Sequence, residues 1–221
     1  MLKTPIIIVN YKTYSASIGR KSVKITSIIE ENCNENWAVV PQTADLRMIS
    51  DETDLPVLSQ HVDAIKPGSN TGHTLLETIV DAGIEGTLIN HSEKRLKLSD
   101  IEYIVNKCKE KDLDSIVCAN NPDVAASAAA LNPEFVAYEP PELIGGDVSV
   151  SSAKPEVVRE AVEKVKKVNQ DVKVLCGAGV KNGEDVKAAL ELGTEGVLLA
   201  SGLVKSDDKE KVIKDLESGI P

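Results

Sequence analysis

The chain has 221 residues, of which 42% are hydrophobic and 27% are charged, and its formal net charge is −10 at pH 7. This is the composition of a globular protein that is long enough to bury a sizeable core. Lysine and glutamate are mixed along the chain without a basic stripe, which argues against a nucleic-acid partner but not against a small anionic substrate.

Nothing in the sequence predicts a membrane partner or a secreted protein. No stretch is long and apolar enough for a transmembrane helix, and the segment MLKTPIIIVNYK lacks the features of a signal peptide. The cysteines lie far apart without a CxxC pair, at Cys33, Cys108, Cys118 and Cys176. In a reducing compartment they are expected to be buried thiols, so we expect a cytoplasmic protein without a metal site.

Short β-branched runs alternate with amphipathic segments along the whole chain. The runs predict eight strands, at residues 5–9, 37–40, 55–59, 86–90, 114–118, 134–138, 172–176 and 195–200. They are continuously apolar, as expected for parallel strands that are buried on both faces. Helical spacing is clearest at residues 21–32 and 155–168, and a shorter helical segment is expected at 43–50.

Several helix starts carry local signals, either a capping box or a proline at the first helical position. The four motifs are Thr74-x-x-Glu77, Ser99-x-x-Glu102, Asn121-Pro122 and Lys154-Pro155.

Eight strand–helix units in one chain without a linker predict a (β/α)8 barrel, with residues 1–221 forming a single domain. The units average about 27 residues, which predicts a compact barrel with few insertions. An open doubly wound sheet is the alternative, although no GxGxxG motif follows the first strand to support its dinucleotide-binding form.

In such barrels the active site lies where the strands end. Lys12 follows the first predicted strand, His91 the fourth and Glu139 the sixth. Each has an ordinary structural explanation when taken alone. Together they offer a cation, a neutral hydrogen-bond donor and a carboxylate base, a set that suits proton abstraction next to a carbonyl. Glu139 would take the proton, His91 would polarise the carbonyl oxygen, and Lys12 would balance the developing negative charge.

Two other histidines compete with His91 for this role. His91 opens the segment HSEKR, whose expected helical turn would favour the neutral imidazole at its N-terminus. His61 also follows a strand but lacks a neighbouring Ser/Glu pair, and His73 lies in a helix-start signal where solvent exposure is expected.

The loops after the last two strands suggest an anion site. Gly179 and the pair Ala200-Ser201 can offer backbone N–H groups, and residues 201–205 (SGLVK) can form a short helix there. Gly177 and Gly179 can also be explained as turn residues alone. No Walker-type lysine motif is present, so a nucleoside triphosphate is not expected.

Five motifs, in this order, resemble those of the triosephosphate isomerase family. They are NYK at 10–12, NHSEKR at 90–95, YEPPELIG at 138–145, CGAGV at 176–180 and GVLLASG at 196–202. The resemblance covers essentially the whole chain, and its short loops are similar to the compact archaeal type. It implies reversible interconversion of dihydroxyacetone phosphate and D-glyceraldehyde 3-phosphate through an enediolate, without a cofactor. It also implies a cytoplasmic homo-oligomer, a homodimer or homotetramer, that serves glycolysis and gluconeogenesis.

The resemblance also implies a role for individual residues. Glu139 is implied as the base, His91 as the electrophile, and Asn10 and Lys12 as substrate-binding residues. The phosphate site is implied at Ile144, Gly179, Ala200 and Ser201. Supporting roles fall to Glu93 as the partner of Lys12, to Ser92 as the partner of Glu139 when the lid is open, and to Gly145 in the lid hinge.

Three segments depart from the family pattern. The lid reads IGGD where many members read IGTG, the loop after the third strand reads NTGHT where a glutamate commonly follows the glycine, and CANNP replaces CIGE after the fifth strand. Two other functions are compatible with a barrel. A different sugar-phosphate isomerase or lyase would need another base or a Schiff-base lysine at a strand end, where only Lys12 qualifies. A binding protein without catalysis would lack the base or the electrophile, and both are present.

Overall fold

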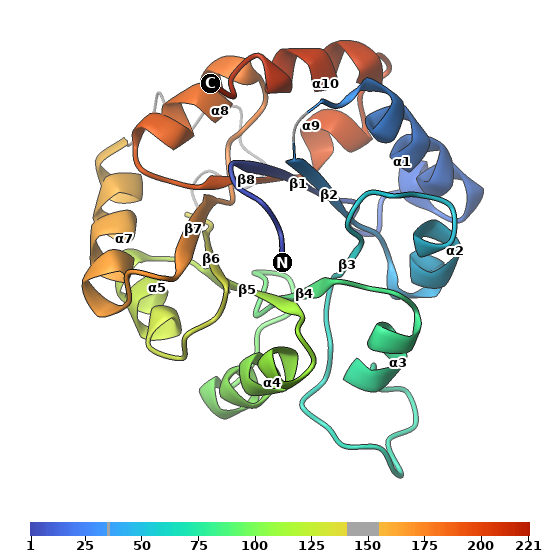
Figure 1. The fold of residues 1–221 in the computed structure, drawn as a ribbon, viewed down its shortest axis with the longest axis vertical. Helices are drawn as coiled ribbons and strands as arrows, with labels where there is room; N and C mark the ends of the chain where they lie inside the picture. The colour runs from blue at the N-terminus through green and yellow to red at the C-terminus, as the bar shows by residue number, and fades with distance from the viewer. Residues whose placement is uncertain (35, 141–154) are drawn as a thin grey trace.

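The computed structural model describes residues 1–34, 36–140 and 155–221, and eight parallel strands form a ring at its centre (Figure 1). The strands are β1 (Ile6–Asn10), β2 (Asn36–Val40), β3 (Leu58–Ser59), β4 (Gly86–Ile89), β5 (Asp114–Ala119), β6 (Phe135–Tyr138), β7 (Lys173–Cys176) and β8 (Gly196–Leu199). Their order is β2-β1-β8-β7-β6-β5-β4-β3, and a parallel bridge between Val39 and Val57 joins the two ends. The predicted (β/α)8 barrel is therefore confirmed, and the open sheet is wrong.

Helices surround the ring of strands on its outer side (Figure 1). They are η1 (Ser15–Ser17), α1 (Arg20–Asn32), η2 (Thr43–Asp45), α2 (Leu46–Ser50), α3 (Leu76–Asp81), α4 (Leu98–Glu110), α5 (Pro122–Ala129), α7 (Pro155–Val168), α8 (Gly183–Glu191), α9 (Ser201–Val204) and α10 (Lys209–Glu217). None of the helices in these described ranges is long and apolar enough to cross a membrane.

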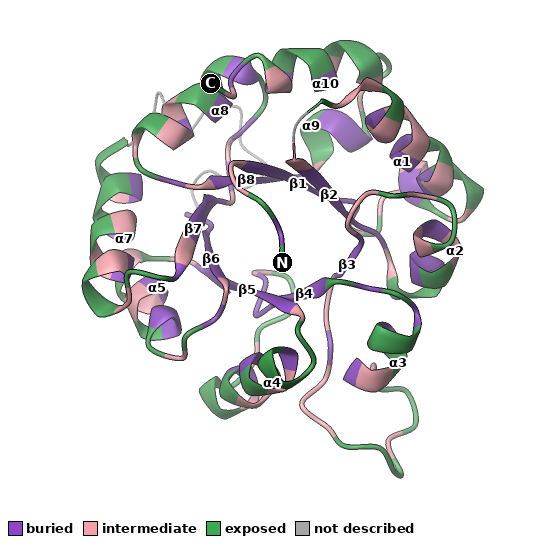
Figure 2. Ribbon diagram, viewed as in Figure 1, coloured by how far each residue is buried: buried purple, intermediate pink, exposed green. Residues whose placement is uncertain are grey.

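Alternate residues of each strand belong to two separate cores, which explains why the strand sequences are apolar without interruption. Ile6 and Ile8 of β1 belong to the core inside the barrel, whereas Ile7 and Val9 belong to the core between strands and helices. Leu2 adds to the inner core at the N-terminal end, which lies at the centre of the ring (Figure 2). Burial on both faces thus fixes the register of every strand.

The helix starts were predicted with mixed success. The Asn121 side chain accepts the N–H of Val124 at 2.8 Å with Pro122 at the first helical position, and α7 begins at Pro155, so both proline signals are confirmed. Both capping boxes are wrong. The N–H of Thr74 is held by the Asp63 carboxylate at 2.7 Å, and α3 begins only at Leu76. Ser99 lies inside the first turn of α4, where its hydroxyl donates to Asp100.

Strand β3 is shorter than the predicted 55–59. Pro56 has no N–H to give to a ladder, and only Leu58 and Ser59 pair as a strand. The Pro56 carbonyl still accepts the N–H of Val39 at 3.0 Å, so the barrel closes here through a single bridge.

Candidate active site

A cavity of about 370 Å³ opens where the strands end, and it collects most of the predicted residues. Its lining includes Asn10, Lys12, His91, Glu93, Glu139, Gly179, Ala200 and Ser201. This volume suits a small ligand. Ser92 is half-buried in the same loop as His91. Ile144 and Gly145 lie outside the described residues, so their roles stay predictions.

Glu139 follows β6 directly and is rigidly mounted. Its N–H donates to the Ala119 carbonyl at 2.8 Å, which continues the pairing of β6 with β5, and only 4% of the residue is exposed. One carboxylate oxygen, Oε1, lies 3.2 Å from His91 Nε2. The other, Oε2, is buried without a hydrogen-bond partner among the described residues. Glu139 therefore contacts His91 rather than Ser92 here, and the Ser92 contact stays a prediction.

Gly177 makes the space in which Glu139 lies. A Cβ atom at this position would stand 2.6 Å from Glu139 Cγ and 3.1 Å from the Tyr138 carbonyl oxygen. The Gly177 N–H donates to that same carbonyl at 2.8 Å, so the backbone cannot easily move away. Gly177 is thus required by the base and is more than a turn residue.

His91 is held in one tautomer by its own loop. Its Nδ1 accepts the N–H of Glu93 at 3.2 Å, so the ring proton of the neutral imidazole lies on Nε2 and points toward Glu139. The N–H of Lys94 donates to the His91 carbonyl at 2.8 Å, which makes HSEKR a single turn. The role of His91 as a neutral hydrogen-bond donor stays a prediction.

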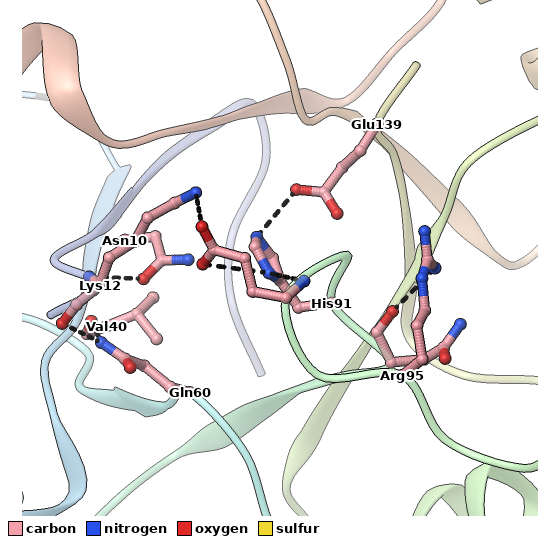
Figure 3. A network of polar contacts seen from close by, with 9 residues as sticks. Asn10, Lys12, Val40, Gln60, His91, Arg95 and Glu139 are labelled. Carbon is pink, nitrogen blue, oxygen red and sulfur yellow. Dashed lines mark hydrogen bonds and ion pairs between the residues drawn. The ribbon is translucent and has the colours of Figure 1, made fainter. Parts of the chain in front are cut away.

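Lys12 reaches the same cavity from a constrained backbone (Figure 3). Its φ is +46°, its N–H donates to Asn10 Oδ1 at 2.9 Å, and Gln60 Nε2 donates to its carbonyl at 2.9 Å. The ammonium lies 2.9 Å from Glu93 Oε1, and 15% of the lysine side chain is exposed. A left-handed lysine persists because these neighbours fix it, which is common at functional sites.

The other histidines lie elsewhere. His61 Nε2 pairs with Asp63 Oδ1 at 3.0 Å, and the residue lines an adjoining cavity of about 380 Å³, whose lining also includes Lys12 and His91. His73 is exposed, as predicted. Of the three histidines in the chain, all described, His91 is the one in contact with Glu139.

Three of the four cysteines are buried thiols. Burial raises the pKa of the Cys118 thiol well above its ordinary value, and the negative charge of Glu139 raises it further. Burial likewise raises the pKa of Cys176 to about 12. The prediction of buried thiols is confirmed for Cys108, Cys118 and Cys176, whereas Cys33 is only half-buried. No group of three or more potential metal ligands occurs in the described ranges.

Several cavity residues were not predicted from the sequence. Tyr14 and Lys181 line the cavity, and the Lys205 ammonium lies 4.2 Å from the centre of the Tyr14 ring. Lys181 follows a predicted phosphate loop, a position from which it could have been proposed. Nothing in the local sequence indicates that Lys205 and Tyr14 meet, because the contact joins the two ends of the chain.

Comparison with known proteins identifies one family. The sequence profile described as triosephosphate isomerase matches residues 5–216. The chain is 55% identical over 214 residues to triosephosphate isomerase of Methanocaldococcus jannaschii, covering 96% of this chain and 98% of that protein. It is 53% identical over 215 residues to the enzyme of Methanothermus fervidus, covering 96% and 97%, and 51% identical over 220 residues to that of Methanothermobacter thermautotrophicus, covering 98% and 96%.

Proposed function

This chain belongs to the triosephosphate isomerase family, and on that premise we propose how its residues divide the work of the reaction. The chain is an isomerase that interconverts dihydroxyacetone phosphate and D-glyceraldehyde 3-phosphate. The observation that carries the assignment of roles is the 3.2 Å contact between His91 Nε2 and Glu139 Oε1, beside the Lys12 ammonium in one cavity.

Glu139 acts as the base. Its carboxylate removes the proton from the carbon next to the substrate carbonyl and later returns it to the neighbouring carbon. The isomerisation is complete once the hydroxyl proton has also moved from one oxygen of the enediolate to the other. Its burial and its unpartnered Oε2 support this role, because an oxygen without a hydrogen-bond donor among the described residues stays available to accept a proton.

His91 and Lys12 stabilise the enediolate that forms between the two proton transfers. The N–H at His91 Nε2 donates to the carbonyl oxygen, which gains negative charge as the proton leaves. Lys12 supplies a fixed positive charge on the same side of the cavity, held by Glu93 at 2.9 Å. A glutamate base paired with a neutral histidine is the established arrangement in this family, and the contacts above support the assignment of that pair to Glu139 and His91.

The substrate phosphate is bound at the other end of the cavity. Gly179 has a φ of +74°, which exposes its backbone to the cavity, and Ala200 and Ser201 begin α9 beside it. Asn10 lines the reacting end, next to Lys12. This arrangement supports a site in which backbone N–H groups bind the anion. Ile144 is proposed to complete it, from the sequence alone.

Replacing the base by its amide tests the central assignment. We expect Glu139→Gln to lower kcat by about 10³-fold or more while changing the affinity for glycerol 3-phosphate, an unreactive phosphate ester, only severalfold. A coupled assay of glyceraldehyde 3-phosphate formation without added cofactor measures the rate. Equal losses of rate and inhibitor affinity would contradict the role of Glu139 as base.

The histidine assignment has a matched control in the same chain. His91→Gln is expected to lower kcat by about 10²-fold or more, whereas His61→Gln should retain nearly full activity because His61 pairs with Asp63 and not with Glu139. The opposite pattern would transfer the electrophilic role to His61.

We also propose that the chain forms symmetric homo-oligomers, a homodimer or a homotetramer. The loop between β3 and α3 extends away from the barrel, and its residues are largely exposed or half-buried (Figure 2). The second cavity, lined by Thr13, Thr43 and Gln60 beside Lys12, offers a place for the corresponding loop of another copy, in which Thr71 lies exposed in a turn. Exposed apolar side chains at Ile18 and Leu98 support such burial.

Light scattering coupled to size-exclusion chromatography tests this assembly. The chain mass is 23.7 kDa, so a particle of two or four times that mass supports the proposal, and a monomer at micromolar concentration would overturn it.

A cytoplasmic location and a role in both glycolysis and gluconeogenesis complete the proposal. All four cysteines are unpaired, which is typical of proteins in a reducing compartment. A reversible isomerase serves both directions of triose metabolism. Fractionation of cells with an antibody to the chain would test the location, and recovery outside the cytoplasmic fraction would contradict it.

A further inference from the structure

The loop at residues 90–96 carries two of the groups to which the proposed function assigns roles. His91 presents Nε2 to Glu139 at 3.2 Å, and Glu93 both donates its N–H to His91 Nδ1 and holds Lys12. The loop is not part of a regular element, since β4 ends at Ile89 and α4 begins at Leu98. Something other than secondary structure must therefore fix its geometry.

Asn90 ties both ends of this loop together and to the barrel. Its side-chain Oδ1 accepts the N–H of Leu96 at 2.9 Å, and its Nδ2 donates to the Cys118 carbonyl at the end of β5 at 3.0 Å. Its own carbonyl accepts from Arg95 Nη1 at 3.1 Å. In Figure 3, Arg95 and Lys12 lie on opposite sides of His91. Asn90, which is buried, thus connects the start and the end of the loop that contains His91 and Glu93.

The backbone of Asn90 is itself unusual. Its φ is +61°, and four described non-glycine residues have a positive φ: Lys12, Asn90, Asp112 and Asn132. Asp112 and Asn132 lie in turns just after helices α4 and α5, where a left-handed residue is common. Lys12 and Asn90 follow strands instead; Lys12 lines the active-site cavity, and Asn90 directly precedes His91, which also lines it. Asparagine adopts this conformation more easily than most residues, and it also supplies the amide.

We infer that Asn90 is a positioning residue for the isomerase reaction, which acts by holding the loop that carries His91 and Glu93 against the end of β5. The inference rests on the roles proposed above for His91 and Glu139. Glycine at this position would satisfy the left-handed backbone but would leave the N–H of Leu96 and the carbonyl of Cys118 without their partner. Loss of that clamp allows His91 to move relative to Glu139, and displacements near 1 Å cost about 10²-fold in rate.

The variant Asn90→Gly removes the side-chain amide but keeps a residue that readily adopts a positive φ. We expect kcat, counted per inhibitor-binding site, to fall by about 10- to 100-fold. The affinity for glycerol 3-phosphate should stay within about twofold, because the phosphate end lies at Gly179 and Ser201 and does not depend on this loop. The ¹⁵N signals of the His91 ring should also change, since the Glu93 N–H that defines the tautomer belongs to the loosened loop.

Asn132→Gly is the matched control. Asn132 has a φ of +58° and is exposed, and its side chain bonds only to Asn169 among the described contacts, far in the fold from β4. Asn132→Gly should keep wild-type kcat. If it lost activity as Asn90→Gly does, the effect would belong to any left-handed asparagine and the inference would be wrong.

Arg95→Met gives a second variant for the case in which Asn90→Gly does not fold. It removes the donor to the Asn90 carbonyl, the one hydrogen bond of Arg95 among the described contacts, and we expect kcat to fall about threefold at unchanged inhibitor affinity. Wild-type kcat in whichever of Asn90→Gly and Arg95→Met folds would overturn the inference. Equal losses of rate and inhibitor affinity in these variants would also overturn it. His91→Gln is measured alongside. If His91→Gln lowers kcat by about 10²-fold or more while Asn90→Gly keeps wild-type kcat, only this inference fails, whereas wild-type kcat in His91→Gln would contradict the role proposed for His91.

Discussion

Gly177→Ala should displace the base without removing it. The added Cβ would lie 2.6 Å from Glu139 Cγ, about 0.8 Å short of ordinary contact at 3.4 Å. The backbone at Gly177 is held by the Tyr138 carbonyl, so Glu139 has to move. A shift of this size should lower kcat by about 100-fold, which corresponds to about 2.7 kcal/mol of barrier.

The assay compares three quantities in Gly177→Ala and wild type: kcat, the affinity for glycerol 3-phosphate and the melting temperature. Overpacking is expected to cost about 1 to 3 kcal/mol of stability, so the variant should still fold. Glu139→Asp, which withdraws the carboxylate by one methylene group, should lose rate to a similar extent. Gly202→Ala adds a Cβ that meets nothing closer than 3.9 Å, and it should not lower the melting temperature. Wild-type kcat in Gly177→Ala would refute the argument that Glu139 needs this space.

Contacts outside the cavity lead to three further predictions. Burial raises the pKa of Asp63, but hydrogen bonds from the chain and from His61 outweigh it and hold the pKa below its ordinary value. Asp63→Asn should therefore lower the free energy of unfolding, measured by urea titration at pH 7, by about 1 to 2 kcal/mol. This difference from wild type should shrink as the pH falls below about 4, because the Asp63 carboxyl binds a proton at a higher pH in the unfolded chain than in the folded protein. When the protein is treated with a thiol reagent at pH 8, one cysteine, Cys33, should react in the native protein and all four should react in the denatured protein. Two or more rapidly reacting thiols in the native protein would contradict the described packing. Glu217→Gln weakens the acceptor of the Trp37 indole N–H and should lower the free energy of unfolding by about 1 kcal/mol. Unfolding can be followed by the fluorescence of Trp37, the single tryptophan of the chain. An unchanged free energy of unfolding would mean that the bond contributes nothing.

The barrel could be predicted because its strands are buried on both sides. Runs such as IIIV in β1 are apolar at consecutive positions, and this pattern differs from the alternation of a half-exposed sheet. The helix starts were harder, since their caps depend on partners across a loop. The capping box at Thr74 does not form, because α3 begins only at Leu76 and the Thr74 N–H, which Glu77 would have to accept, is held by Asp63, eleven residues earlier in the chain. Local sequence does not reveal such competition.

The charged groups of the site could be predicted from their places at strand ends, whereas the groups that hold them could not. Lys12, His91 and Glu139 stand out because a charge or an imidazole after a buried strand is unusual. Gln60 and Gly177 do not stand out. The amide of Gln60 reaches the carbonyl of Lys12 from another strand, and the missing Cβ of Gly177 matters only because Glu139 lies beside it. Their roles are defined by neighbours that the sequence does not bring together.

Amide side chains hold both segments that present the charged groups. Asn10 accepts the N–H of Lys12, Gln60 donates to its carbonyl, and Asn90 closes the loop of His91. An ionised clamp at any of these places would add a charge within a few ångströms of Glu139 or Lys12 and would alter the balance that the enediolate requires. An amide fixes geometry with a donor and an acceptor at once and adds no net charge. Neutral clamps therefore let the backbone be fixed without changing the electrostatics of the reacting centre.

On this reasoning, Gln60→Glu should impair the reaction more than Gln60→Met. Both variants lose the two bonds to the Lys12 and Val40 carbonyls, but only the first adds a negative charge beside Lys12. Measured kcat/KM for the two variants would decide it, and equal values would show that the neutrality of the clamp is irrelevant.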